Sequence, residues 1–169
     1  MDKLFKYFLI ILPLLTLISC NKGITPNPVE KAGFRGKIIF TGAWPDSVKN
    51  TLLVVFIDPL NSPASFNVFN VGYISHPIPY GVSEVNFSTA EDTGFVPIRA
   101  GSYAYVAIAQ SKKAALSLNR SDWNVAGIYY ADGDTSQPGK LVIPPNTFVK
   151  NVNIICNFNN PPPQPPGGN

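Results

Sequence analysis

The chain has 169 residues, of which 14% are charged, and its formal net charge is +3. So small an excess of positive charge excludes the broad basic surface with which proteins bind nucleic acid or anionic membranes. A weakly charged chain with 12% aromatic residues and 17 prolines favours an all-β domain.

The first twenty residues are typical of a secretory signal. Lys3 and Lys6 supply a positive start, and an apolar run over residues 4–18 accompanies them. This run falls short of the roughly 20 apolar residues of a membrane-spanning helix, and Pro13 interrupts it. A cleaved signal is therefore favoured over the alternative, an uncleaved N-terminal membrane anchor.

The end of this segment, from Leu17 to Cys20, reads Leu-Ile-Ser-Cys. It resembles the lipobox of bacterial lipoproteins, in which a peptidase cuts before the cysteine and the cysteine sulfur carries a diacylglycerol. The resemblance implies a signal peptide over residues 1–19, lipidation of Cys20, and a membrane as partner, because several acyl chains hold a protein firmly to a bilayer. An acylated Cys20 leaves Cys156 without a disulfide partner, whereas a free Cys20 leaves a bridge to Cys156 open.

Residues 20–31 are interpreted as a flexible tether, because they contain two prolines and no apolar period. Asn21 stands where the resemblance would place an aspartate in lipoproteins retained at the inner membrane. The acidic cluster associated with surface export in some lipoproteins is also missing from the next residues. We therefore predict a protein of the bacterial cell envelope, lipid-anchored in the outer membrane and facing the periplasm.

A β domain is predicted over residues 32–159. Phe34, Ile38 and Phe40 fall on one face of the first segment, and charged residues fall on the other, which is typical of a half-buried strand. Residues 51–58 form a continuous apolar run of strand length, and this run predicts a strand that is buried on both faces.

Further strands are predicted where side chains alternate between two faces and turn residues separate the runs. The alternation is least regular over residues 65–74, and Pro97 suggests an edge position for residues 95–99. Residues 111–122 lack a convincing helix cap and are interpreted as either a single helical turn or a loop. The other predicted strands are residues 82–88, 102–110, 123–130, 140–143 and 148–158.

The last predicted strand places Cys156 on the same face as Val152 and Ile154, as a small and unreactive core residue. Residues 160–169 contain no core residue and predict a disordered or polyproline-II tail. Short strands separated by turns predict an all-β fold, a single antiparallel β-sandwich of about eight strands. A closed barrel is the alternative.

Two motifs resemble strands of the transthyretin-like, carboxypeptidase-regulatory-like β-sandwich domains. Phe-x-Gly-x-Ile-x-Phe at residues 34–40 is similar to their first strand, and Ala-Gly-Ser-Tyr-Ala-Tyr-Val at residues 100–106 is similar to their later Gly-x-Tyr strand. Gly-Ala-Trp-Pro at residues 42–45 stands where the family often has a Pro-Leu-x-Gly-Ala-like segment. The resemblance, over about residues 33–158, implies an accessory or binding module without catalytic residues.

His76 is the single histidine, so a catalytic triad or a zinc site would have to use it. One histidine and one buried cysteine are too few ligands for zinc, and we predict neither an enzyme nor a cofactor. Asp132, Asp134 and Ser136 have the alternating oxygen spacing of a calcium loop. They lack the later acidic ligand, and a hairpin turn formed by the aspartates is favoured instead.

Aromatic residues are the remaining candidates for a binding site. Trp44, Trp123, Tyr129 and Tyr130 lie in or beside predicted loops, where a flat exposed cluster could stack on sugar rings or anchor a protein. The same residues also serve as packing at strand ends. The predicted function is a membrane-anchored, non-enzymatic envelope module that binds a partner or has a structural role, and the alternative is a carbohydrate-binding surface lipoprotein. Its partner would be an envelope protein or a glycan, and not a nucleic acid.

Overall fold

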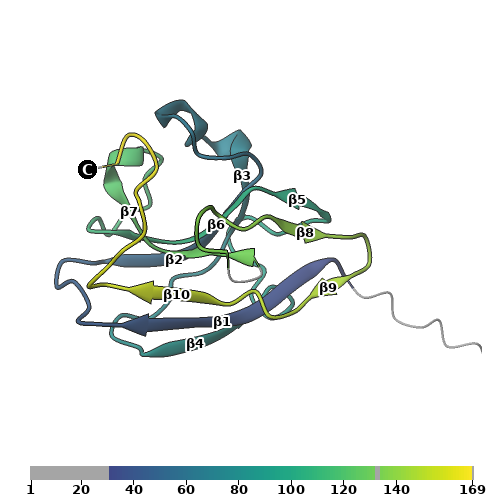
Figure 1. Ribbon diagram of the computed structural model, residues 1–169, viewed down its shortest axis with the longest axis horizontal. Coiled ribbons are helices and arrows are strands. Elements are labelled where there is room, and N and C mark those ends of the chain that lie inside the picture. The colour runs from purple at the N-terminus through teal and green to yellow at the C-terminus, as the bar shows by residue number, and fades with distance from the viewer. Residues whose placement is uncertain (1–30, 132–133, 169) are drawn as a thin grey trace, which may run out of the picture.

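The computed structural model describes residues 31–131 and 134–168, so the predicted signal peptide, Cys20 and nearly all of the tether lie outside the described residues. The described residues form ten β-strands and three short 3₁₀ helices without an α-helix, which confirms the all-β class (Figure 1). The strands are β1 (Gly33–Thr41), β2 (Asn50–Phe56), β3 (Val71–Ile74), β4 (Glu84–Ser88), β5 (Gly101–Tyr103), β6 (Tyr105–Ser111), β7 (Trp123–Tyr129), β8 (Leu141–Ile143), β9 (Phe148–Val149) and β10 (Ile154–Asn157), and the 3₁₀ helices are η1 (Pro63–Ser65), η2 (Val68–Asn70) and η3 (Arg120–Asp122).

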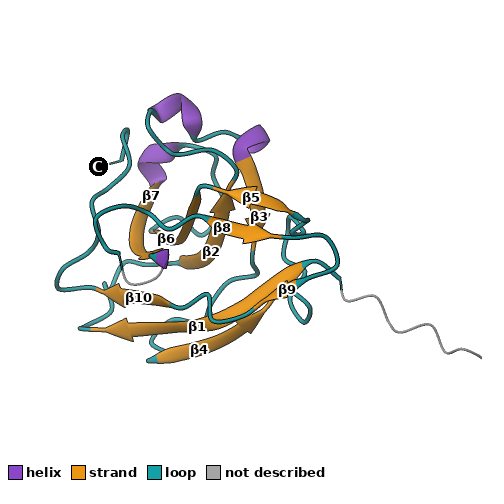
Figure 2. Ribbon diagram, turned by 45° about the vertical axis from the view of Figure 1, so that its right-hand side comes forward, coloured by secondary structure: helices purple, strands orange, loops and turns teal. Residues whose placement is uncertain are grey.

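One large sheet has the strand order β3-β2-β6-β7-β10-β1-β4, with β9 paired to β1, and β5 and β8 form a separate small sheet. The large sheet curls, so that β10, β1 and β4 form one layer and β2, β6 and β7 bend away above it in a sandwich-like arrangement (Figure 2). The large sheet is mixed, whereas the sequence predicted purely antiparallel pairing. The difference arises because β9 and β10 both run parallel to β1.

The inner core fills the inside of this curl. Phe34, Ile38 and Phe40 point into it from β1, as their spacing predicted, and the exposed fraction of each is 6% or less. Cys156 is also there as a fully buried free thiol, and burial raises its pKa to about 12. The prediction that this cysteine is an unreactive core residue is consistent with both observations.

An outer core lies on the opposite face of β2, β6 and β7. Every residue of β2 is buried, because Leu53 and Val55 join the inner core while Leu52 and Val54 join the outer core. The continuous apolar run therefore correctly predicted a strand that is buried on both faces. Loop residues such as Phe66 pack against the outer core.

The predicted strand over residues 65–74 is reduced to the four residues of β3. Its first part folds instead into η2, where the side chain of Asn67 accepts hydrogen bonds from the backbone N–H groups of Phe69 and Asn70. Such local bonds give the backbone an alternative to a strand ladder. The predicted edge strand over residues 95–99 is reduced to one bridge, between Ile74 and Val96.

Two other predicted strands are interrupted. The backbone N–H of Ala104 turns to the carbonyls of Phe56 and Ile57, and this separates β5 from β6. Tyr103 consequently joins the inner core and Tyr105 the outer core, although the predicted alternation placed them on one face. The strand over residues 148–158 is broken near Asn151, whose φ of 63° is left-handed.

The C-terminal segment, residues 160–168, is attached to the sheet, whereas the sequence predicted a disordered or polyproline-II tail. The side chain of Gln164 accepts a hydrogen bond from the N–H of Val125 at 2.7 Å and donates one to the carbonyl of Val125 at 2.9 Å. An amide side chain thus occupies the hydrogen-bonding position of a neighbouring strand, and proline content alone gave no sign of it.

Candidate functional site

The aromatic residues predicted to bind a ligand lie in separate places. Trp44 packs at one end of the inner core, where its ring centroid is 4.6 Å from that of Phe40 and 5.1 Å from that of Phe158. Its indole N–H donates to the carbonyl of Val82 at 3.0 Å. The neighbouring Tyr80 ring lies at 5.2 Å but is tilted by 60°, so these two rings do not form a flat platform.

The other three aromatic candidates are distributed between the two cores. Trp123 is buried in the outer core, and its indole N–H donates to the carbonyl of Ser117 at 2.8 Å. Tyr129 packs against the inner core and Tyr130 against the outer core. Trp123 and Tyr130 nevertheless each line a pocket, as described below.

The predicted calcium loop is only partly described, because Asp132 lies outside the described residues. Asp134 accepts a hydrogen bond from the backbone N–H of Ser136 at 2.9 Å, and bonds from the side chain and the backbone of Ser136 lower the pKa of Asp134. This contact is typical of an aspartate that stabilises a turn. Within residues 31–131 and 134–168, no three His, Cys, Asp or Glu side chains are grouped as metal ligands.

An apolar pocket of about 160 Å³ opens on the outer core, beside the loops that follow β2 and β6. Leu116 and Leu118 belong to its lining and are 50% and 66% exposed, so the rim is apolar as well. Its sheet side includes Leu52, Val54 and Trp123, and its loop side includes Phe66, Leu116 and Leu118.

The two polar residues of the apolar pocket, Asn67 and Ser117, are occupied by bonds within the chain. The side chain of Asn67 caps η2 and donates to the carbonyl of Ala64 at 2.8 Å. The hydroxyl of Ser117 donates to Asp122 at 2.5 Å, while its carbonyl accepts the indole N–H of Trp123. The lining of the pocket is therefore largely apolar, and its two polar side chains are already hydrogen-bonded to other described residues.

The loop that carries Leu116 and Leu118 is attached at two points. Lys113 forms an ion pair with Asp122 at 2.9 Å, and the side chain of Asn50 donates to the carbonyl of Lys113 at 2.8 Å. Hydrogen bonds from Ser117 and Lys113 lower the pKa of Asp122. These contacts hold the apolar rim over the sheet, and those of Lys113 and Ser117 end on Asp122 in η3.

A second pocket, of about 460 Å³, lies beside the C-terminal segment, and we name it the tyrosine pocket. Tyr105 from β6, Tyr130 after β7, and Gln164 and Pro165 from the C-terminal segment belong to its lining. Tyr105 is 5% exposed, and its buried hydroxyl has no hydrogen-bond partner among the described residues. Burial raises the pKa of Tyr105 well above its usual range.

Arg120 joins the C-terminal segment to the outer core. It is 7% exposed, and its guanidinium donates to the carbonyl of Trp123 and, at 2.9 Å, to the carbonyl of Pro165. Its Cζ lies 5.9 Å from the ring centroid of Phe66, which lines the apolar pocket. Burial lowers the pKa of Arg120, and its Nε has no partner within the described part of the chain.

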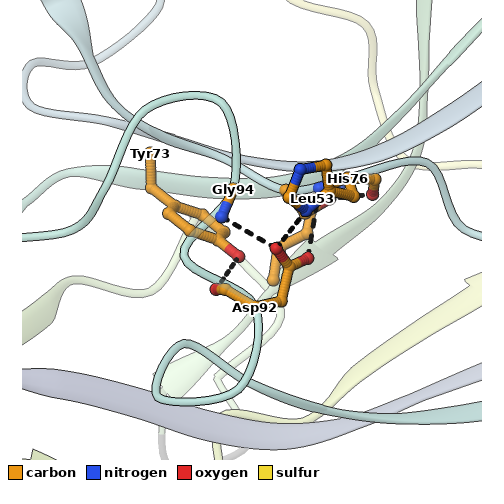
Figure 3. A network of polar contacts seen from close by, with 6 residues as sticks. Leu53, Tyr73, His76, Asp92 and Gly94 are labelled. Atoms are coloured by element: carbon orange, nitrogen blue, oxygen red, sulfur yellow. Dashed lines mark hydrogen bonds and ion pairs between the residues drawn. The ribbon is translucent and has the colours of Figure 1, made fainter.

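His76 and Asp92 form a polar cluster away from these pockets (Figure 3). The His76 Nδ1 lies 2.5 Å from an oxygen of Asp92, and the Asp92 carboxylate also accepts the N–H groups of Gly94 and His76. Ser75 donates its hydroxyl to the His76 carbonyl, not to the imidazole. The three residues therefore do not have the geometry of a catalytic triad.

Both pockets are built from segments that are far apart in the sequence. The sequence did contain a sign of the apolar pocket, because Leu116 and Leu118 are apolar residues in a segment without helix caps or strand alternation. Nothing in the sequence indicated that the Tyr105 hydroxyl would lack a hydrogen-bond partner among the described residues, because this depends on how β6 packs against the C-terminal segment.

Comparisons with protein families, with curated proteins and with solved structures found no match to this chain. The lipobox and the transthyretin-like resemblance consequently stay predictions. Within the described residues, no helix is both long and apolar enough to cross a bilayer.

Proposed function

We propose that the protein is a non-enzymatic binding module of the bacterial cell envelope, held at the outer membrane by lipid on Cys20 and facing the periplasm. The residues from Leu17 to Cys20 support the anchor, because their order matches a lipobox after a short apolar run. Among the described residues, the hydroxyl of the neighbouring Ser75 bonds the His76 carbonyl and not its imidazole, so the proposal gives the His76–Asp92 pair no catalytic role.

The apolar pocket is the observation that carries the binding function. An enclosed cavity of about 150 Å³ lined by aliphatic and aromatic side chains can hold one benzene molecule, and this pocket has a similar volume of about 160 Å³. Its two polar side chains, Asn67 and Ser117, already have partners. The fitting occupant is one aromatic or branched aliphatic side chain, and not a sugar.

The exposed rim suggests that this side chain belongs to a protein. Leu116 and Leu118 surround the opening, and Phe69 of the neighbouring η2 is 91% exposed. A central pocket for one anchoring side chain, surrounded by apolar contacts, is the usual arrangement at the energetic centre of a protein interface. We infer that the partner is an envelope protein that inserts one apolar side chain between these loops.

Site-specific crosslinking in intact cells tests this function. A photoreactive amino acid is placed at Leu118 or, as a matched control, at Ile155, which is 64% exposed on another part of the sheet. We expect one discrete crosslinked band from position 118 and none from position 155. The band should disappear when Ala109→Leu fills the pocket, since Ala109 belongs to its lining.

Two results would contradict the proposal. One is equal crosslinking from both positions, which would indicate random contact. The other is a band from position 118 that survives Ala109→Leu in a folded protein, because the partner would then touch the loop without entering the pocket. Circular dichroism of the Ala109→Leu variant checks that it is folded.

A further inference from the structure

The tyrosine pocket differs from the apolar pocket in size and chemistry. Its volume of about 460 Å³ falls in the range of about 300–1,000 Å³ that is usual for small-molecule sites. Its lining includes Asn61 from the loop after β2, Tyr105 from β6, Tyr130 after β7, and Gln137 from the loop before β8. Segments from four parts of the chain therefore place polar and aromatic groups around one space.

Several of these polar groups form no hydrogen bond with another described residue. The hydroxyl of Tyr105 is buried and forms no hydrogen bond with a described residue. No hydrogen bond within the described chain engages the side chains of Asn61, Tyr130 or Gln137. The hydroxyl of Tyr105 is enclosed by protein atoms, whereas the side chains of Asn61, Tyr130 and Gln137 can bond a ligand without breaking a hydrogen bond within the described chain.

The charge of the lining restricts the ligand. No Asp, Glu, Lys or Arg is among the described residues that line the tyrosine pocket. Amide and hydroxyl groups beside two tyrosines and several prolines fit a neutral ligand that has both hydroxyl groups and apolar ring faces. Sugars combine these two properties.

We propose that the tyrosine pocket binds a neutral saccharide, at a site separate from the apolar pocket. Tyr105 and Tyr130 provide aromatic surface, Tyr130 also provides a hydroxyl group, and Asn61 and Gln137 provide amide groups from two loops. Gln164 is already bonded to Val125 on both sides of its amide, so it holds the wall of the pocket and does not contact the ligand.

The test is a titration of the purified full-length chain in detergent with methyl glycosides of neutral hexoses, pentoses, 6-deoxyhexoses and N-acetylhexosamines, followed by calorimetry and saturation-transfer NMR. We expect at least one of these sugars to bind at millimolar concentration or below. Absence of binding for the whole panel would overturn the proposal.

Conservative variants assign the bound sugar to the pocket. Tyr130→Phe removes a hydroxyl that forms no hydrogen bond with a described residue, so the protein should fold while its sugar affinity falls by about 3- to 10-fold. Gln137→Ala, in an exposed loop, should have a similar effect. The matched control is Tyr80→Phe, because Tyr80 is an exposed tyrosine that packs against Trp44 and does not line the tyrosine pocket.

A failure of sugar binding can be told apart from a failure of the crosslinking experiment, because the two experiments test different pockets. Ala109→Leu should leave sugar affinity unchanged, because Ala109 lines the apolar pocket and not the tyrosine pocket. Affinity lost in Tyr80→Phe but kept in Tyr130→Phe would overturn the proposal and place the sugar beside Trp44. Affinity unchanged in both Tyr130→Phe and Gln137→Ala would overturn it as well.

Discussion

At the scale of single residues, Asp92 connects the end of β3 to the loop after β4. Its carboxylate accepts the N–H groups of Gly94 and His76 at 2.7 and 3.1 Å and contacts the His76 imidazole, while its carbonyl accepts the hydroxyl of Tyr73 at 3.1 Å (Figure 3). Burial acts to raise the pKa of Asp92, but the bonds from Gly94 and His76 outweigh it and the pKa is lowered.

This lowered pKa predicts acid sensitivity. A carboxyl group whose folded-state pKa lies below its unfolded value of about 3.9 contributes stability above that pH, and the contribution is lost as the pH falls through the folded-state pKa. Asp92→Asn should therefore lower the free energy of unfolding at neutral pH by about 1 kcal/mol, because the site is partly solvent-exposed. It should also flatten the decline of stability below about pH 4.

Urea unfolding at several pH values measures both effects. Asp46→Asn is a suitable control, because Asp46 is an exposed aspartate in the loop after β1 and forms none of the ion pairs found among the described residues. Identical pH profiles for Asp92→Asn and the unmodified protein would show that the cluster does not stabilise the fold.

At the scale of elements, the C-terminal segment acts as a partial strand. β10 pairs with β7 only at Tyr129 and Ile128, so the part of β7 around Val125 lacks this neighbour. Gln164 supplies the missing donor and acceptor through its side chain, and Arg120 holds the next carbonyl, that of Pro165. The C-terminal segment, in which Pro165 is buried, thus completes the hydrogen bonding of a buried strand.

Replacing Gln164 should show how far β7 depends on the C-terminal segment. Gln164→Ala leaves the backbone N–H and carbonyl of Val125 without partners, and we expect a loss of about 1–3 kcal/mol in unfolding free energy. Hydrogen exchange at the amide of Val125 should accelerate more than at amides in the centre of β2. Unchanged exchange at Val125 would contradict a structural role for the C-terminal segment.

How well the sequence predicted an element depends on which interactions stabilise that element. The alternation in β1 and the apolar run in β2 reflect burial by the sheet itself, and both predicted their strands correctly. The capping bonds of Asn67 and the left-handed backbone at Asn151 override the same kind of pattern locally. The pockets were beyond prediction, because their walls meet only after β6 and β7 have packed against distant loops.

At the scale of the whole molecule, the proposed anchor determines where the two pockets can act. Cys20→Ala should abolish incorporation of radiolabelled fatty acid and leave a precursor that still carries residues 1–19. Cys156→Ala is the matched control and should keep the label, because Cys156 is buried in the inner core. Labelling that persists in Cys20→Ala would refute the lipobox interpretation.

The position of β10 has a consequence for how this chain is made. β10 is the last strand in the sequence, yet it lies between β7 and β1 in the middle of the sheet, with Ile154 beside Ile38 and Tyr129. Pairings between such distant segments form slowly, because a long loop must close first. Under the proposed export across a membrane from the N-terminus, the pairings of β10 with β1 and β7 therefore form only after residues 154–157 have emerged on the far side.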